Sequence, residues 1–157
     1  MSRVYSFEDV VCTISGPFAS FDLSKGAGVA DEGISIDFDE DKATKTMGAG
    51  GDGMYSLHAA NGGSCTIRLL KTSPMNARLS QMYDYETSSS AYYGQDTITV
   101  RDAIRGDNWV LQGCGFRRHP PGGYGKEGGI VEWSFHALVV DGKFGDGSPI
   151  TAFSRVA

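Results

Sequence analysis

The sequence predicts a mostly β domain of the α+β class, an antiparallel β-sandwich or β-barrel with one flanking α-helix. Glycine makes up 22 of the 157 residues and clusters at apparent turns, which is typical of a chain with many short strands. Several segments alternate apolar and polar side chains, the period-two pattern of strands. Only residues 74–86 show clear helical spacing. We therefore expect seven to nine strands, with one helix between the middle strands.

The length fits a single domain, which we expect to span residues 1–157. Its core is expected at about residues 4–142, with residues 143–157 as a C-terminal extension. The hydrophobic fraction of 40% lies in the range of globular proteins. No linker, internal repeat or low-complexity tract divides the chain.

Residues 33–41 are expected to form a strand with one apolar and one acidic face. Ile34, Ile36 and Phe38 fall on the apolar face. The acidic face carries Ser35, Asp37, Asp39 and Asp41. Such a face is either a solvated sheet surface or the lining of a channel in a ring-forming protein. A calcium loop is disfavoured, because the EF-hand pattern lacks its glycine and its final glutamate here.

The segments around this strand also favour β structure. Residues 4–15 and 18–23 are predicted to form a hairpin around a Gly-Pro break. Residues 48–53 contain four glycines but match neither common phosphate-binding pattern, so we expect a flexible or tightly turning loop. Residues 54–61 are ambiguous between a short helix and a strand, whereas residues 64–71 are predicted as a strand.

Residues 74–86 carry the features of an amphipathic helix. Ser73 is a suitable N-cap, and Pro74 suits the first helical position. An apolar stripe is expected to pack against the sheet, and it consists of Met75, Leu79, Met82 and Tyr83.

The C-terminal half reads as three strands joined by polar turns. Residues 96–102 alternate strictly, with Thr97, Thr99 and Arg101 on the polar face. An Arg-Gly-Asp tripeptide precedes the strand predicted at residues 108–118, and we interpret it as a hairpin turn.

The longest strand is predicted at residues 130–142, after a loop over residues 119–129. Glu132, Ser134 and His136 share its polar face. Neighbours on one strand face lie about 7 Å apart, which is too far for direct contact between a nucleophile and its base. These three side chains are therefore not expected to be catalytic.

The composition disfavours several classes of function. The net charge of −5 argues against binding nucleic acid through its phosphates. Three widely spaced cysteines predict buried thiols in a reducing compartment and neither a disulfide framework nor a metal site. The absence of a long apolar run predicts a protein without a membrane anchor that stays soluble in the cytoplasm where it is made. The residues predict no active site and no cofactor.

Four segments in one order along the chain resemble a known family. They are YSFEDVVCTISGP at residues 5–17, GISIDFDEDKATKTMGAGGDGMYSLHA at 33–59, GSCTIRLLKTSPMNARLSQMYD at 63–84 and KEGGIVEWSFHALVVDG at 126–142. Over residues 4–142 the chain resembles the tail tube protein of contractile-tailed bacteriophages, in the family of Mu-like and PhiTE-like tube subunits. The most specific phrases are TIRLLKTSPMNARLSQMY and EGGIVEWSF.

The resemblance implies a fold similar to that of type VI secretion tube proteins, and a structural role without catalytic residues or cofactor. Six subunits would form a ring with a ring-wide β-barrel as its inner wall. Rings would stack into a tube inside a contractile sheath and form the conduit for DNA ejection. The implied partners are further copies of the chain and the sheath, terminator, baseplate and tape-measure proteins. The implied location is the virion tail, after assembly in the host cytoplasm.

The resemblance also gives the polar residues candidate roles. Side chains on the polar strand faces are candidates for the channel wall, and the sequence does not choose among Asp37, Asp39, Asp41, Thr97, Thr99, Arg101, Glu132, Ser134 and His136. The glycine-rich region at residues 42–53 is a candidate for contact between rings, with Lys42, Lys45 and Asp52 as the contacting residues. Alternatives are a type VI secretion-like ring protein and a small β-domain that acts as a binding or chaperone module.

Overall fold

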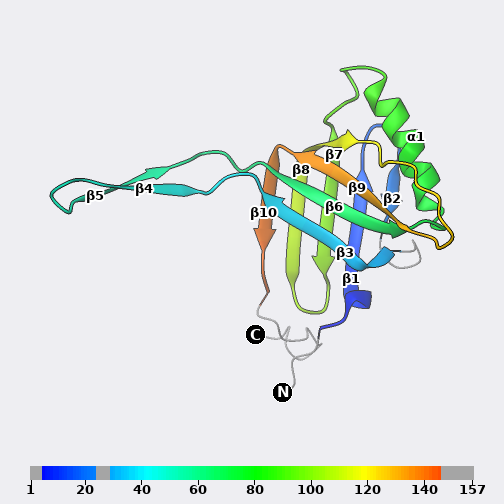
Figure 1. Cartoon of the computed structure of the whole chain (residues 1–157), viewed down its shortest axis with the longest axis horizontal. Helices are drawn as coiled ribbons and strands as arrows, with labels where there is room; N and C mark the ends of the chain where they lie inside the picture. The colour runs from blue at the N-terminus through cyan, green and yellow to red at the C-terminus, as the bar shows by residue number, and fades with distance from the viewer. Residues whose placement is uncertain (1–4, 24–28, 146–157) are drawn as a thin grey trace, which may run out of the picture.

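The protein consists of two packed layers of β-strands, one α-helix and a long projecting hairpin (Figure 1). The computed structural model describes residues 5–23 and 29–145. The elements are η1 (Phe7–Asp9), β1 (Val10–Ser15), β2 (Ser20–Asp22), β3 (Val29–Phe38), β4 (Ala43–Met47), β5 (Gly53–Leu57), β6 (Gly63–Leu70), α1 (Met75–Thr87), β7 (Asp96–Asp102), β8 (Asp107–Arg118), β9 (Ile130–Ala137) and β10 (Val139–Lys143).

The two layers are antiparallel sheets that share one strand. The β7 layer contains β2, β1, β7, β8 and β10, and the β6 layer contains β3, β6, β9 and the end of β8. In Figure 1, β3, β6 and β9 run obliquely across the front of β10, β8, β7 and β1. Each layer therefore has one face toward the core and one face away from it.

Strand β8 joins the layers because it bends between its two halves. Its first half pairs with β7 and β10, and its last residues pair with β9. Gly113, with φ of +65°, lies between the halves, and a Cβ there would approach Leu138 to 2.9 Å. A strand that changes sheets needs such a local irregularity, and glycine adopts it without strain.

The core lies between the layers and beneath the helix. Its largest side chains are Trp133, Phe116 and Phe135, and the Phe116 ring lies 4.7 Å from that of Phe135 and 5.8 Å from that of Trp133, centroid to centroid. The other fully buried apolar side chains come from β1, β6, β7, β8, helix α1 and the residue after β2: Cys12, Ile14, Leu23, Cys65, Ile67, Leu69, Leu79, Met82, Ile98, Leu111 and Cys114. Burial of this surface is the main stabilising contribution.

Helix α1 packs on the core as its apolar stripe predicts. Leu79 and Met82 are buried, and Met75 and Tyr83 pack against the core at its margin. Ser73 caps the first turn, since its Oγ accepts a hydrogen bond from the backbone N–H of Met75 at 3.2 Å. The indole N–H of Trp133 also donates to Asn76 Oδ1 at 3.0 Å, which ties the helix to β9.

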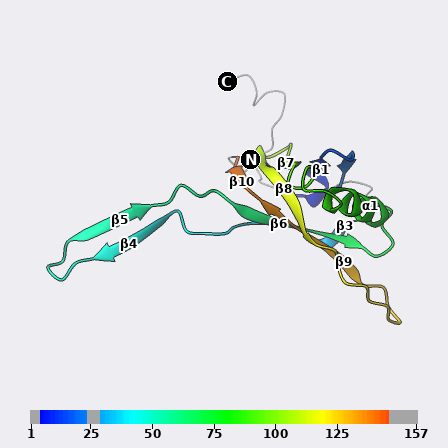
Figure 2. The ribbon, with the colours of Figure 1, turned by 90° about the horizontal axis from the view of Figure 1, so that it is seen from above.

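Strands β4 and β5 form a hairpin that projects from the body of the protein (Figures 1 and 2). The hairpin continues the paths of β3 and β6, and the hydrogen bond from the His58 N–H to the Lys42 carbonyl, 2.8 Å, closes its base. Residues 48–53 form its tip, with Gly51 at φ of +91°. The ambiguous segment at residues 54–61 is thus a strand in its first part.

The structure confirms a mostly β fold with one helix, in the form of a sandwich and not a closed barrel within the described residues. The predicted strand at residues 130–142 is instead two strands, since the chain leaves the β6 layer at Leu138 and enters the β7 layer as β10. With this break, and with β4, which was not predicted as a strand, the described parts of the chain contain ten strands. Residues 4 and 24–28 of the predicted core and residues 146–157 of the predicted extension lie outside the described residues.

Candidate assembly surfaces

The outward face of the β6 layer carries a continuous row of polar side chains. We call it the polar face, and it consists of Ser35, Asp37, Ser64, Thr66, Arg68, Arg118, Glu132, Ser134 and His136. Register places Asp37 beside Ser64 and His136, and Ser35 beside Thr66 and Ser134. The alternate residues of β6 and β9 point into the core. Four separate sequence segments, β3, β6, the end of β8 and β9, therefore contribute to one surface.

Arg68 organises the middle of the polar face. Its Nη1 donates to Ser35 Oγ at 3.0 Å, and its Nε lies 3.6 Å from Glu132 Oε2. These contacts link β3, β6 and β9 across the outside of the layer. The face is therefore of mixed charge. The strand at residues 33–41, taken alone, had suggested an acidic face.

Two of the predicted acidic residues do not lie on a strand. Strand β3 ends at Phe38, so Asp39 and Asp41 belong to the connection that leads to the hairpin. The Asp39 N–H donates to the Gly62 carbonyl at 3.1 Å, one position beyond the last paired residues of β3 and β6, Phe38 and Gly63. The strand prediction was therefore wrong beyond Phe38, because alternation alone does not show where pairing stops.

The candidates on β7 occupy a different surface from those on β3 and β9. Ile98 and Val100 point into the core, so Thr97, Thr99 and Arg101 point away from it on the outside of the β7 layer. Register places Thr97 beside Ser15 and Thr99 beside Thr13. The outward faces of two packed layers point in opposite directions, so these residues do not share a surface with Glu132 and Ser134.

The hairpin exposes apolar side chains that no other described segment covers. Every residue of β4 is exposed, and Tyr55 and Leu57 of β5 are 75% and 78% exposed. Register puts Leu57 beside Ala43 and Tyr55 beside Lys45, so they share one side of the hairpin. A two-stranded hairpin is at best marginally stable alone in water. Its exposed apolar side chains are typical of a surface that another chain covers.

The three predicted contact residues occupy different places on this hairpin. Lys42 is at the base, where its Nζ donates to Asn61 Oδ1 at 2.9 Å, so its side chain is held by the subunit itself. Lys45 lies halfway along, and Asp52 lies at the tip, where its carbonyl accepts from the Gly48 N–H at 2.7 Å. Lys45 and Asp52 are both exposed on the projecting part of the hairpin.

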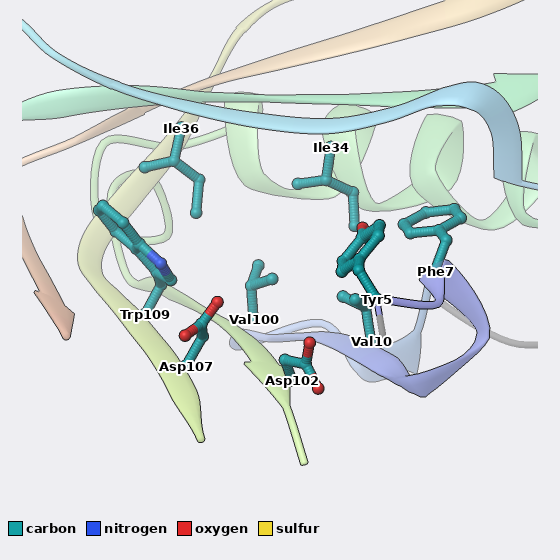
Figure 3. A pocket seen from close by; sticks show the side chains of 9 residues that line it. All are labelled: Tyr5, Phe7, Val10, Ile34, Ile36, Val100, Asp102, Asp107 and Trp109. Carbon is teal, nitrogen blue, oxygen red and sulfur yellow. The ribbon is translucent and has the colours of Figure 1, made fainter. Parts of the chain in front are cut away.

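A pocket opens at one end of the sandwich, between β3 and the β7 layer (Figure 3). Its volume is about 240 Å³, and it is lined by Tyr5, Phe7, Val10, Ile34, Ile36, Val100, Asp102, Asp107 and Trp109. Ile34 and Ile36 point into it from above in Figure 3, and Val10 and Val100 point up from below.

The polar groups near this pocket are engaged in structural contacts. Arg105 Nη1 lies 2.7 Å from Asp9 Oδ2 and 3.3 Å from Asp102 Oδ1. The arginine of the Arg-Gly-Asp tripeptide therefore fixes the β7–β8 turn, as predicted for a turn. The Asp107 carboxylate accepts from the Gly145 N–H at 2.7 Å. No nucleophile and base are brought together at this pocket.

The cysteines are buried and unreactive. Cys12, Cys65 and Cys114 are free thiols in the core. Burial raises the pKa of Cys12 and of Cys114 to about 12, and it raises the pKa of Cys65 further. Since the thiolate is the nucleophile and the metal ligand, these side chains are not catalytic. In the described ranges no three metal-binding side chains gather at one place, and no helix is long and apolar enough to cross a membrane.

Comparison with known proteins identifies a family and a fold. A family model described as bacteriophage PhiTE tail tube protein matches residues 1–145. A chain in the baseplate of the anti-feeding prophage superposes with a TM-score of 0.59 at 11% identity, covering 92% of this chain and 98% of its own. A chain in the cap that terminates the anti-feeding prophage tube has a TM-score of 0.55 at 12% identity, covering 92% and 95%.

A third similar structure comes from the sheath–tube complex of an extracellular contractile injection system in the extended state. Its TM-score is 0.50 at 11% identity, with coverage of 85% of this chain and 88% of its own. At these identities the similarity concerns the fold. A comparison with curated protein sequences found no match.

Proposed function

The chain belongs to the family of the bacteriophage PhiTE tail tube protein, and from this premise we propose that six copies form a ring and that rings stack into a hollow tube. The family is structural, so the protein is not an enzyme. The tube lies inside a contractile sheath and conducts DNA out of the virion. Its other partners are the terminator, baseplate and tape-measure proteins, and it assembles in the cytoplasm of the host.

The structures with the same fold support this assembly. The baseplate that holds one similar chain was solved with six-fold symmetry. Another similar chain lies in a complex of sheath and tube, and a further one lies in a sheath/tube terminator. The family match favours the phage tail tube over a type VI secretion-like ring protein or a binding module.

The open edge of β3 supports lateral closure of the ring. Strand β3 has ten residues and pairs with β6 on one side, and no strand in the described part of the chain pairs with its other side. A long unpaired edge promotes aggregation unless it is covered. In a closed ring, a strand of the next subunit covers this edge, so that the β6 layers of all subunits join into one barrel.

The polar face is the surface that we assign to the channel wall. Helix α1 and the β7 layer both pack on the inner side of the β6 layer, so among the described residues the polar face is the side of this layer that is left uncovered (Figure 2). Continuation of this layer through the β3 edge makes the polar face continuous around the ring. Asp37, Glu132 and Ser134 then face the channel, whereas Thr97 and Thr99 face away from it.

The charge of this face suits a conduit. Asp37 and Glu132 lie on this face together with Arg68 and with Arg118, which register places beside Ser134, and Asp39 and Asp41 lie next to the end of β3. A wall without clustered positive charge does not retain phosphates, so DNA passes without binding. The projecting hairpin, with Lys45 and Asp52, contacts a subunit of the adjacent ring, where its exposed apolar side chains become buried.

The family match over residues 1–145 is the observation that carries this proposal. Negative-stain electron microscopy of the purified protein tests it. We expect rings with a central hole, some of them stacked into tubes, and longer tubes when the sheath protein is added. A protein that remains monomeric at high concentration, even beside its sheath partner, would contradict the proposal.

A further inference from the structure

Two buried carboxyl side chains meet where the end of α1 contacts the β7 layer. Glu86 is in the last turn of the helix, and Asp96 is the first residue of β7. Both residues are 0% exposed, and none of their four carboxylate oxygens has a hydrogen-bond partner. An ionised carboxylate is strongly disfavoured in such a place, and a buried carboxyl group therefore tends to take up a proton.

The described titratable side chains that lie near the pair have hydrogen-bond partners of their own. The titratable groups that face it are Tyr93 from the connection before β7 and Cys114 from β8, with Tyr83 of α1 beside Tyr93. The Tyr93 hydroxyl donates to the Phe116 carbonyl at 2.6 Å, and the Cys114 thiol donates to the Leu111 carbonyl at 3.3 Å.

The turn between β1 and β2 covers the pair from the remaining side. Its Gly16 backbone packs so closely that a Cβ there would collide with Asp96 Oδ1 and would lie 3.0 Å from the methyl group of Met82. A proton between the two carboxyl groups is thus the simplest way to satisfy them.

The pKa values of Glu86 and Asp96 agree with this geometry. Burial raises the pKa of Glu86 to about 9, and the adjacent Asp96 contributes to that shift. Burial also raises the pKa of Asp96 to about 6, although its interaction with Glu86 acts in the opposite direction. Two such groups titrate as a pair, and near neutral pH the pair holds one proton.

We propose that Glu86 and Asp96 share one proton and form an alkaline-sensitive lock that fixes the last turn of α1 to the β1–β2 turn and to the start of β7. With the proton in place, one carboxyl group donates to the other. Without it, two negative charges lie buried together at the C-terminal end of a helix, where the helix dipole also disfavours them. The lock is a property of the single subunit and does not rest on the tube assembly.

The sign of the pH effect follows from the direction of the shifts. Both carboxyl groups have a higher pKa in the folded protein than in the unfolded chain. The stabilisation is therefore complete at acidic pH and is lost as the pH rises through the folded values. Above about pH 9 we expect the end of α1 to detach from the β1–β2 turn before the whole sandwich unfolds.

Thermal unfolding of the full chain between pH 5 and pH 10 tests the lock. For the wild type we expect Tm to fall by ~5–10 °C between about pH 7 and pH 9. Glu86→Gln should lose most of this slope, because a neutral amide can donate to Asp96 at every pH. Asp84→Asn, an exposed change on the same helix, should keep the wild-type slope. A Glu86→Gln protein with the wild-type slope would overturn the proposal.

A measurement on the wild type covers the case in which Glu86→Gln does not fold. Carbon-13 NMR of the side-chain carboxyl groups reports their protonation directly. At pH 7 we expect one proton on the pair and a second transition near pH 9. Two fully ionised carboxylates at pH 7 would refute the lock.

Discussion

Removal of the β4–β5 hairpin should separate assembly from folding. Residues 43–57 can be replaced by Asn-Gly, because Lys42 and His58 already face each other through a backbone hydrogen bond of 2.8 Å, and a two-residue turn joins such a pair. The hairpin packs no side chain into the core. We therefore expect the free energy of unfolding of the subunit to change by less than ~1 kcal/mol.

The expected effect on assembly is much larger. Burial of an exposed leucine contributes ~1.5–3 kcal/mol, and Tyr55 and Leu57 are both about three-quarters exposed in the subunit. Replacing both by serine should cost each contact between rings ~3 kcal/mol. Since ~1.4 kcal/mol is a factor of ten, the concentration required for tube growth should rise ~100-fold.

Light scattering and sedimentation measure this critical concentration, and circular dichroism measures folding. The hairpin-deleted protein should form at most single rings, and Tyr55→Ser with Leu57→Ser should lie between it and the wild type. Tyr124→Ser is the matched control, because Tyr124 is 91% exposed in the loop before β9. Tubes of normal length from the deleted protein, or loss of its fold, would refute the reasoning.

Two further predictions address the core and the channel. Trp133→Ala removes a fully buried ring and its hydrogen bond to Asn76, so urea unfolding should show that the free energy of unfolding falls by ~3–5 kcal/mol. A decrease below ~1 kcal/mol would show that Trp133 is not part of a tight core. Asp37→Lys combined with Glu132→Lys should leave tube assembly intact and slow DNA ejection from phage that carry the variant, because added positive charge on the polar face retains phosphates. Failure of the tubes to assemble would place these residues at a subunit interface instead.

Several elements follow from local sequence because local physics determines them. Residues 74–86 show a capping serine, a proline at the first turn and an apolar stripe, and the helix forms from Met75 to Thr87. Strict alternation at residues 96–102 predicts β7 to the residue. The Gly-Pro break at residues 16–17 likewise separates β1 from β2.

Other features depend on contacts between distant segments, which alternation does not report. The β9–β10 break at Leu138 arises because β8 bends at Gly113 and brings a second layer within reach. Strand order places Asp37 and Glu132 on the same outward face and Thr99 on the opposite outward face. The sequence alone does not determine this order.

The buried carboxyl pair is a further feature that the sequence does not reveal. Glu86 occupies a position on the helix that continues the apolar stripe from Leu79 and Met82, but its charge suggests exposure. Only the packing of the β1–β2 turn over Asp96 shows that both groups are enclosed.

Chemical labelling of assembled tubes tests the assignment of the polar face to the channel most directly. Cysteine can be placed at Glu132 on the polar face or at Arg101 on the outside of the β7 layer, and the buried native thiols give little background. We predict that Glu132→Cys reacts with a maleimide carrying a large polymer in free subunits but is protected in tubes, whereas Arg101→Cys reacts in both. Free reaction of Glu132→Cys in intact tubes, with protection of Arg101→Cys, would contradict the account.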